Sequence, residues 1–585
     1  MTKYEVLLKI LDTIIKEAPT SMSKKYPSSI TDEEQLNQAR SRAFIHLYLK
    51  VSFGLLDFGE REHFITDGSY DGGVDGYYLN KENKTIYFIQ SKFRANEKNF
   101  ENKEISLQEI LVMDINRILD GDDSDEVGNK YNGKIKQLQR EITELDGIAR
   151  YSYKVIILAN LAAIPPSKMR QLTGGYSTEI IDYEKCYEKL LFPIISGTYF
   201  NASDLSINID LSNKNAGSKI SYTVQTKKGE CEITVLFVPT IELGKIMFKY
   251  KNSILKYNPR SYLDFEGYKV NNAIRETIIN TATNEFALFN NGITMLSDET
   301  FISEKIGQKN KAQLVVKNPQ IINGGQTSFT LSRIYQEYLE NNVDQVFQSK
   351  EVLLKVITLS DKANHEDKIE LIEDISTATN SQTPVLNADK LSNELIHVKI
   401  QKILFDRYGL LYERKRGEFG DGIYNHYIDD NQIIERNLFF RMYYAGNGNI
   451  SLSRQKKLFL KQNFTEETLD AKEKMDNAYF CYLCFLDLFK KKNLQHKEIT
   501  IYAKVYAMTI LYKPNTIESY SSSIQENIIV FEKRWPEFIE FASKNKLANK
   551  VEKASLTSKN KLSSIKTRWY DSPEFAEDVV EYYSK

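Results

Sequence analysis

The stretch DGSYDGGVDGYYLNKENKTIYFIQSKFR, residues 67–94, decides the fold expected for the first part of the chain. Three aspartates, Asp67, Asp71 and Asp75, stand four residues apart in a loop that is rich in glycine. Two β-prone runs follow, GVDGYYL and TIYFIQSKF, on either side of an asparagine-containing turn. Bounded runs of this kind are typical of paired strands, so the sequence predicts a β-hairpin after the loop.

The predicted hairpin would place Asp75, Gln90 and Lys92 at the same end of a sheet. Side chains alternate between the two faces of a strand, so Gln90 and Lys92 share a face. A carboxylate at this end can hold a divalent cation, which polarises a scissile phosphate and lowers the pKa of a bound water. A lysine close to that water can stabilise the developing negative charge. The three residues therefore suit phosphodiester hydrolysis.

The loop is also compatible with a calcium site or with a plain surface turn. The aspartates fit part of a calcium-binding EF-hand frame, but the position that must carry a bidentate glutamate is Tyr78, and a strand follows instead of a helix. In a plain surface turn, Lys92 would lay its aliphatic stem along apolar surface with its charge in water. A turn of that kind would give these residues no chemical role.

The segments around the hairpin predict the layers of the first domain. Residues 1–18 and 28–56 have apolar positions at helical spacing, and residues 101–145 form a polar helical region. Residues 153–161, YKVIILANL, are a continuous apolar run, which is typical of a strand buried on both faces. Strands alternating with helices in this order predict an α/β layer with a mixed sheet.

The second half of the chain contains two glycine turns. Alternating strands are expected over residues 199–237, and a helix is expected to begin near Pro239. FNNGIT, residues 289–294, predicts a hairpin because Asn-Gly accommodates positive φ. QIINGGQTSFTLSRIY, residues 320–335, predicts a strand, a tight loop and a helix whose N-terminus could bind an anion, although it is also simply a good helix start. Helices are expected from about residue 436 onward.

The bulk properties exclude several classes of protein. The formal net charge is −1, so a nucleic-acid partner would have to bind a local patch. The chain has four cysteines, which are too few for a disulfide framework and suit a reducing compartment; Cys481 and Cys484 lie in an apolar helical run and are interpreted as core thiols. No apolar run approaches the ~20 residues of a membrane span. We therefore expect a cytoplasmic protein without a membrane partner.

The run GGVDG…YFIQSKF resembles the active-site signature of the PD-(D/E)xK nuclease superfamily, in the restriction-endonuclease-like branch that carries Q-x-K. The resemblance implies that Asp75 binds Mg²⁺ or Mn²⁺, that Gln90 takes the acidic position and contributes to the metal site, and that Lys92 is catalytic. Such folds often add a carboxylate from the first helix, for which Glu33 is the candidate. Because Gln90 offers a neutral oxygen, the site has one negative charge fewer to hold the metal.

A second resemblance covers residues 238–447. The segments VPTIELGKI, NPRSYL, VNNAIRETI, FALFNNGIT, QIINGGQTS, ISTATNSQTPV and YERKRGEF occur there in this order. Together they resemble the AIPR family, the abortive infection phage resistance proteins of bacteria. The resemblance implies a role in antiphage defence, and a nuclease-like N-terminal domain joined to this module is an arrangement seen in that family.

The strand-NGGQ-helix element also resembles ParB/sulfiredoxin-like nucleotide-binding folds. This resemblance implies a pocket for a nucleotide or a nucleic-acid phosphate, with a basic cluster beside it. The basic cluster could equally be a solvated loop, and the basic segment 544–568 could be a solvated helical face or a nucleic-acid contact. The residues implied in the pocket are Asn323, Gly324, Gly325, Gln326, Thr327, Asn380, Gln382, Arg414, Lys415 and Arg416.

The sequence thus predicts an α/β multidomain protein. Its expected parts are a restriction-endonuclease-like mixed sheet flanked by helices (1–190), a β-rich connecting segment (191–237), a central α+β AIPR module (238–447) and a mainly helical C-terminal region (448–585). The expected function is antiphage defence by a Mg²⁺-dependent endonuclease, on DNA in preference to RNA. A nucleotide, a phage-derived activator or homo-oligomerisation would control it. The alternative is an inactive nuclease fold that serves as a nucleic-acid or nucleotide sensor and signals through a partner.

Overall fold

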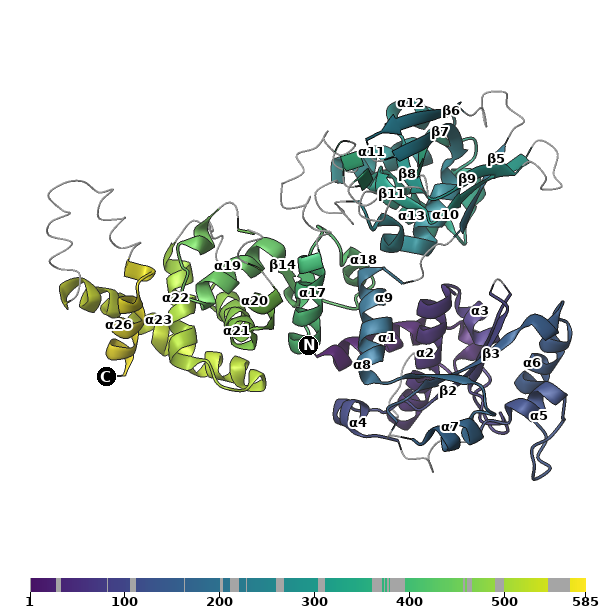
Figure 1. Ribbon diagram of the computed structural model, residues 1–585, viewed down its shortest axis with the longest axis horizontal. Helices are drawn as coiled ribbons and strands as arrows, with labels where there is room; N and C mark the ends of the chain where they lie inside the picture. Colours follow the sequence, from purple (N-terminus) through teal and green to yellow (C-terminus); the bar gives the residue numbers. More distant parts are fainter. Residues whose placement is uncertain are drawn as a thin grey trace. The chain divides into compact units, whose positions relative to one another are not determined.

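The structure is a computed structural model, and Figure 1 shows its helices and strands in chain order. The residues that it describes are 2–27, 33–81, 83–105, 112–161, 164–199, 204–210, 220–227, 229–258, 268–303, 311–359, 371–372, 374–375, 378, 395–455, 458–459, 464, 466–489, 499–545 and 569–584.

The N-terminal part contains a four-stranded mixed sheet in the order β1-β2-β3-β4. The predicted hairpin is confirmed: β1 and β2 pair antiparallel, with Tyr77 opposite Phe88. The predicted buried strand is also confirmed, since β3 pairs parallel to β2 and β4 continues in parallel. The strands are β1 (Gly76–Asn80), β2 (Thr85–Ser91), β3 (Ser152–Leu158) and β4 (Ser177–Ile181).

Helices cover both faces of this sheet. On one face, Tyr77, Phe88 and Val155 join a buried cluster with apolar side chains of α5, α6 and α7. On the other face, α2 contacts β2, and Phe53 at the end of α2 stacks on Tyr78 with ring centroids 4.2 Å apart. The helices of this part are α1 (Lys3–Lys16), α2 (Glu33–Phe53), α3 (Phe58–His63), α4 (Glu97–Asn102), α5 (Ile115–Asp120), α6 (Gly133–Thr143), α7 (Pro166–Leu172), α8 (Tyr183–Cys186) and α9 (Phe192–Ser196).

The two long N-terminal helices differ in how they are buried. In α1, a capping box between Thr2 and Glu5 fixes the first turn, and one apolar face is buried as the spacing predicts. In α2, by contrast, every residue of the stretch 43–49 is buried, including His46. The buried surface of α2 is therefore wider than the single apolar stripe that helical spacing predicts. The reason is that α2 packs against both α1 and the sheet.

The central part contains two further sheets. A five-stranded sheet has the order β11-β8-β12-β7-β6, and a three-stranded sheet has the order β5-β10-β9. Helices α10 and α13 pack on each other so closely that a Cβ on Gly244 would lie 3.2 Å from the Leu331 carbonyl oxygen. The elements are β5 (Asp204–Asp210), β6 (Ile220–Thr226), β7 (Gly229–Pro239), α10 (Thr240–Tyr250), α11 (Tyr268–Ile279), α12 (Phe286–Phe289), β8 (Ile293–Ser297), β9 (Thr300–Ser303), β10 (Lys311–Lys317), β11 (Gln320–Asn323), α13 (Gly325–Tyr338), α14 (Val343–Val346) and β12 (Glu351–Leu359).

The turn FNNGIT does not close a hairpin as the sequence predicted. It links the short helix α12 to β8, and β8 pairs with β11 and β12 instead. Gly292 does take positive φ, at 82°. A Cβ there would lie 2.8 Å from the Leu353 carbonyl oxygen, so glycine is required by the close approach of β12 as well as by the turn.

The C-terminal region is helical, as predicted. Its buried core is rich in aromatic side chains, among them Phe440, Phe480 and Trp535. Cys481 and Cys484 are buried in α21, and Cys481 Sγ lies 3.1 Å from Thr509 Oγ1, which confirms their interpretation as core thiols. The elements are α17 (Leu395–Tyr408), β13 (Leu411–Glu413), α18 (Gly420–Tyr424), β14 (Ile433–Glu435), α19 (Arg436–Gly446), α20 (Glu466–Asp470), α21 (Lys472–Phe489), α22 (Ile499–Tyr512), α23 (Tyr520–Asn545) and α26 (Pro573–Tyr583).

The chain divides into two compact units that are interleaved in sequence. The first unit comprises Met1–Pro384 and Arg416–Asp429, and the second comprises Val385–Lys415 and Asp430–Lys585. The fold class is thus α/β with mixed sheets and a helical C-terminal region. Among the helices that the structure describes, none combines the length and apolar character needed to cross a membrane.

Candidate functional site

The loop before β1 gathers three carboxylates in one place. Asp67, Asp71 and Asp75 each offer an oxygen, and these oxygens all lie within 4.8 Å of one another. Asp71 and Asp75 are buried, whereas Asp67 is half-buried. Sequence reasoning assigned only Asp75 to a hydrolytic site. The sequence signal for Asp67 and Asp71 was their four-residue spacing. In an irregular loop, this spacing brings the carboxylates together only if the tertiary fold of the loop does so.

Hydrogen bonds and two glycines explain why the loop folds in this way. Asp71 accepts hydrogen bonds from the backbone N–H of Gly73 (2.9 Å) and of Gly68 (3.2 Å), so its carboxylate closes the turn around itself. Gly72 and Gly73 both have positive φ, at 63° and 72°. A Cβ on Gly73 would lie 2.5 Å from the Val112 carbonyl oxygen, so no larger residue fits at this position.

Asp75 lies at the start of β1, against the end of β2. Its Oδ2 accepts a hydrogen bond from the Ser91 backbone N–H at 2.7 Å. Burial raises the pKa of Asp75 from 3.8 to about 7, and the negative charges of Asp71 and Asp67 act in the same direction. The Ser91 amide and the charge of Lys92 oppose the rise without cancelling it. Asp75 is therefore a carboxyl group that titrates near neutral pH.

Gln90 and Lys92 come from the same end of the hairpin. The Gln90 side chain has no exposed surface, and its Nε2 donates to the Gly73 carbonyl oxygen at 2.8 Å, so it holds the glycine turn in place. Lys92 follows β2 and is half-buried. It lies close enough to Asp71 and Asp75 for its charge to lower the pKa of both.

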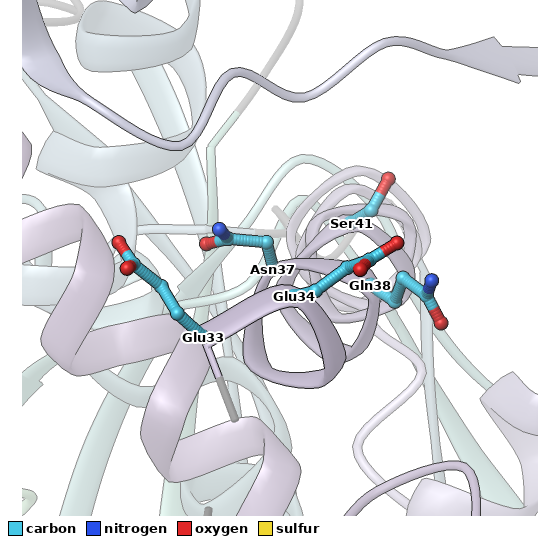
Figure 2. A pocket seen from close by; sticks show the side chains of 5 residues that line it. All are labelled: Glu33, Glu34, Asn37, Gln38 and Ser41. Atoms are coloured by element: carbon cyan, nitrogen blue, oxygen red, sulfur yellow. The ribbon is translucent and has the colours of Figure 1, made fainter. Parts of the chain in front are cut away.

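Glu33 occupies a different kind of environment. It is the first residue of α2 and is exposed, in an open depression of about 580 Å³ (Figure 2). The other residues around this depression all come from the first turns of the same helix: Glu34, Asn37, Gln38 and Ser41. Among the described residues, the carboxylates that meet Asp75 come from its own loop, and Glu33 is not one of them.

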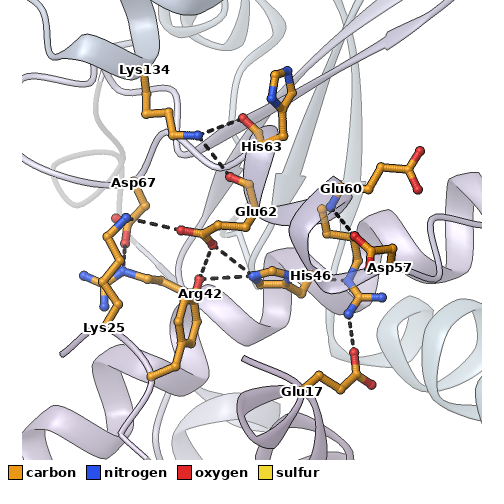
Figure 3. A network of polar contacts seen from close by, with 12 residues as sticks. Glu17, Lys25, Arg42, His46, Asp57, Glu60, Glu62, His63, Asp67 and Lys134 are labelled. Atoms are coloured by element: carbon orange, nitrogen blue, oxygen red, sulfur yellow. Dashed lines mark hydrogen bonds and ion pairs between the residues drawn. The ribbon is translucent and has the colours of Figure 1, made fainter. Parts of the chain in front are cut away.

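Figure 3 shows a network of polar contacts around His46 and Glu62, together with Asp67 of the aspartate group. Arg42 of α2 pairs with the aspartate group, since its Nε lies 2.9 Å from Asp67 Oδ2. In the network, Tyr26 donates to Glu62 at 2.6 Å, and His46 Nε2 lies 3.2 Å from the same carboxylate. Arg61 donates to His46 Nδ1 at 3.2 Å, which leaves the hydrogen of the neutral ring on Nε2.

The network fixes the charges of its members. Burial lowers the pKa of His46, so its ring is neutral. Burial alone would raise the pKa of Glu62, but hydrogen bonds from His46 and Tyr26 and the charge of Lys25 lower it to about 2. His46 is thus a packed structural residue.

The NGGQ element has the predicted strand-loop-helix structure, formed by β11, Gly324 and α13. Gly324 has φ 84°, and a Cβ there would lie 2.8 Å from Ile293 Cγ1. The polar side chains at the helix start bind other parts of the chain. Asn323 Oδ1 accepts from the Gly324 N–H at 2.7 Å, Asn290 donates to Thr327 Oγ1 at 3.1 Å, and Gln326 donates to Asn271 Oδ1 at 3.0 Å.

The remaining residues implied in a nucleotide pocket do not form a single described cluster. Asn380 and Gln382 lie outside the described residues, and so does most of the basic segment 544–568. Arg414 and Lys415 belong to the second unit, whereas Arg416 belongs to the first. The carbonyl oxygen of Arg414 accepts a hydrogen bond from Arg436 at 2.9 Å.

Comparison with known proteins gives one family. A protein-family model described as "AIPR protein" matches residues 255–568, which is more than half of the chain. The matched stretch includes the NGGQ element and continues through most of the helical C-terminal region. It does not include the hairpin with Asp75, Gln90 and Lys92. A search of curated proteins and a search of solved structures each gave no match.

Proposed function

The chain belongs to the AIPR family, and from this premise we propose that it is a bacterial antiphage protein whose N-terminal domain is a metal-dependent endonuclease. The family itself suggests abortive infection defence. The observation that carries the nuclease assignment is the end of the β1–β2 hairpin, where buried Asp75 is joined by Asp71, Gln90 and Lys92. The mixed sheet with helices on both faces supports a restriction-endonuclease-like fold.

The residues at this site fit a divalent cation. Mg²⁺ and Mn²⁺ prefer oxygen ligands, and the loop provides three carboxylates with oxygens within 4.8 Å. The raised pKa of Asp75 indicates that this carboxylate lacks compensating positive charge. Asp75 and Asp71 would hold the ion, with the Gln90 amide oxygen as a neutral ligand. When bound, the ion would polarise the scissile phosphate and lower the pKa of a bound water.

Each residue of the candidate site has a defined role in this proposal. Asp75 must be deprotonated to bind a cation, and because burial raises its pKa to about 7, it loses its proton only near neutral pH. Lys92 supplies a positive charge beside the acidic group, where it can stabilise the negative charge that develops on the phosphate. Gln90 holds Gly73, and the glycine turn lets the backbone approach a phosphate closely. DNA is the proposed substrate, in preference to RNA.

The test compares wild type with Asp75→Ala and Lys92→Ala on plasmid DNA and on total RNA, in Mg²⁺, Mn²⁺ or EDTA. Lys98→Ala is the matched control, because Lys98 is exposed on α4 near the hairpin in sequence. We expect metal-dependent cleavage by wild type and Lys98→Ala and none by the two site variants. The same four proteins are then compared for protection of cells against phage. Protection that survives Lys92→Ala would show that catalysis is not the function.

One observation favours a second candidate function. Gln90 stands where a metal-binding acid is usual, it is fully buried, and its amide nitrogen is engaged by Gly73. A site with this residue in a purely structural role would make the domain an inactive nuclease fold that senses nucleic acid or a nucleotide. Gln90→Glu separates the two functions: it should raise Mg²⁺ affinity and cleavage in an enzyme, and leave a sensor without cleavage.

A further inference from the structure

A large cleft in the first unit has no role in the proposed nuclease chemistry. Its volume is about 1170 Å³. One wall comes from the N-terminal part, namely α2, the segment that leads to α3, and the end of β1. The other wall comes from α10, α13 and α18, and residues of all three helices line it, such as Lys249, Tyr335 and Asp421. The cleft therefore joins the domain that carries Asp75 to α10, α13 and α18, which belong to the same unit.

One end of the cleft is lined by two lysines and two carboxylates, and two arginines contact the same carboxylates. Glu17 accepts from Lys50 at 2.8 Å and also from Arg61, and Asp421 pairs with Lys251 at 2.9 Å. Arg333 Nη2 lies 3.9 Å from the same Asp421 oxygen. Lys50 and Lys251 line the cleft, whereas Arg61 and Arg333 stand outside its lining, and these four cations contact two carboxylates. The side chains of Lys50, Lys251 and Asp421 are only 11%, 16% and 6% exposed, so water screens these charges poorly.

The pKa of Lys50 is lowered chiefly by burial and only secondarily by the cations around it. Burial lowers the pKa of Lys50, and the charges of Arg61 and Lys251 lower it further, although Glu17 opposes the shift. Buried charges are normally compensated by a partner. An anion bound at this end of the cleft would add negative charge beside Lys50 and Lys251.

Two tyrosines add hydrogen-bond donors at the same end. Tyr199 and Tyr427 line the cleft and are each only 3% exposed. Within the described part of the chain, neither hydroxyl makes a hydrogen bond. Burial raises the pKa of both tyrosines, and the nearby charges of Glu17 and Asp421 raise it further. Neither hydroxyl oxygen belongs to the fully buried polar atoms that lack a partner, so both remain accessible from the cleft. Both hydroxyls are therefore suited to donate to a bound anion.

The rest of the cleft differs in character. Phe53 and Tyr78 stack at 4.2 Å along one wall, and Phe248 and Tyr335 lie 5.6 Å apart on the other. The carboxylates at the rim are exposed, and two of them already have partners: Asp57 accepts from the Glu60 N–H, and Glu337 pairs with Arg275. The cleft thus has a buried charged end, aromatic walls and an open polar rim.

We propose that this cleft binds a nucleoside phosphate, with the phosphate at the end formed by Lys50, Lys251, Tyr199 and Tyr427 and the base against the aromatic walls. The assignment goes beyond the proposed nuclease and does not depend on it. It also differs from a site at the start of α13, where Asn323, Gln326 and Thr327 bind other residues of the chain. A ligand in the cleft would contact both the N-terminal domain and the family-matched helix α13.

Equilibrium dialysis with the full chain tests the proposal. The probes are ATP, GTP, adenosine and inorganic pyrophosphate. Tyr427→Phe removes one unpartnered hydroxyl without changing shape, and Lys50→Gln removes one cation but keeps a donor for Glu17. The controls are Tyr222→Phe on the exposed strand β6 and Lys9→Gln, since Lys9 pairs with Asp429 at an exposed site. Melting temperatures of the free proteins verify that each variant is folded.

We expect ATP or GTP to bind wild type and both controls, and to bind Tyr427→Phe and Lys50→Gln about tenfold or more weakly. Adenosine should bind far more weakly than ATP, because it lacks the phosphate. Absence of nucleotide binding at millimolar concentration would overturn the proposal, and so would equal binding by folded Tyr427→Phe. Pyrophosphate binding as tight as that of ATP would overturn the role of the base. Asp75→Ala should bind as wild type does, which separates this result from failure of the nuclease.

Discussion

Replacement of Asp75 with asparagine should stabilise the β1–β2 hairpin at pH 8 and should do so less at pH 5. The folded chain raises the pKa of Asp75 from 3.8 to about 7, chiefly by burial. A carboxyl group with a raised pKa favours folding when protonated, and that contribution is lost as the pH rises from the unfolded to the folded pKa. Asparagine keeps an acceptor for the Ser91 N–H but carries no charge at any pH.

The magnitude follows from the two pKa values. One pKa unit corresponds to about 1.4 kcal/mol. At pH 8, above both values, the shift from 3.8 to about 7 makes ionised Asp75 unfavourable to folding by about 4 kcal/mol. At pH 5, only the interval between the unfolded pKa and the pH counts, so the penalty falls to about 2 kcal/mol. The advantage of the asparagine variant should shrink accordingly.

Hydrogen–deuterium exchange with mass spectrometry measures this effect locally. A local method is needed because a chain with two compact units does not unfold in one step. In EDTA at pH 8, peptides from β1 and β2 should exchange up to about a thousandfold more slowly in Asp75→Asn than in wild type. At pH 5 the ratio should be about tenfold. Added Mg²⁺ should slow exchange in wild type but not in the variant.

Asp123→Asn is the matched control, because Asp123 is an exposed aspartate in the same N-terminal part. It should leave exchange of the β1 and β2 peptides unchanged at either pH. Equal exchange in wild type and Asp75→Asn at pH 8 would refute the argument that Asp75 is a buried carboxylate without enough positive charge. Faster exchange in the variant at pH 8 would have the same meaning.

Three further substitutions test separate parts of the structure. Gly73→Ala should lower the free energy of unfolding by about 1–2 kcal/mol, because alanine is strained at φ 72°, and by more because its Cβ would lie 2.5 Å from the Val112 carbonyl oxygen. The β1 and β2 peptides of this variant should lose protection from hydrogen exchange, and unchanged protection would contradict the turn geometry. Glu62→Gln should destabilise the N-terminal part by about 3 kcal/mol at neutral pH, because the folded pKa is lowered from 4.5 to about 2. This difference should fade in thermal melts as the pH falls from about 4.5 towards 2, and a constant difference would argue against a charge effect. Gly446→Ala should lower the melting temperature of the second unit in calorimetry, because its Cβ would lie 2.8 Å from the backbone of Asn477; an unchanged transition would mean that α19 and α21 separate at little cost.

The sequence predicted the elements whose pattern reports burial directly. The hairpin and the parallel strand β3 follow from β-prone and continuously apolar runs, and both are present. The FNNGIT turn shows the limit of such reasoning. Asn-Gly indicates positive φ at Gly292, which is correct, but it does not reveal whether the preceding residues form a strand or a helical turn. That outcome depends on how β8 pairs within the central sheet.

The candidate site also contains residues that the sequence could place and residues that it could not. Asp75, Gln90 and Lys92 could be placed at one end of a hairpin from strand alternation alone. Asp71 could not, because its position depends on a glycine turn with positive φ that the loop sequence leaves open. The cleft could not be predicted from the sequence, because Glu17 and Tyr427, which line the same end of it, lie more than 400 residues apart in the chain.

The interleaving of the two units constrains how this protein can be cut or recombined. β13 and β14 of the second unit pair in parallel, with Leu411 opposite Ile433, yet the connection between them contains the segment Arg416–Asp429 of the first unit. The chain therefore passes between the units at three points. A single proteolytic cut or gene fusion cannot release either unit whole. Exchange of one unit between relatives would have to carry residues 416–429 along, so the two units are expected to be inherited together.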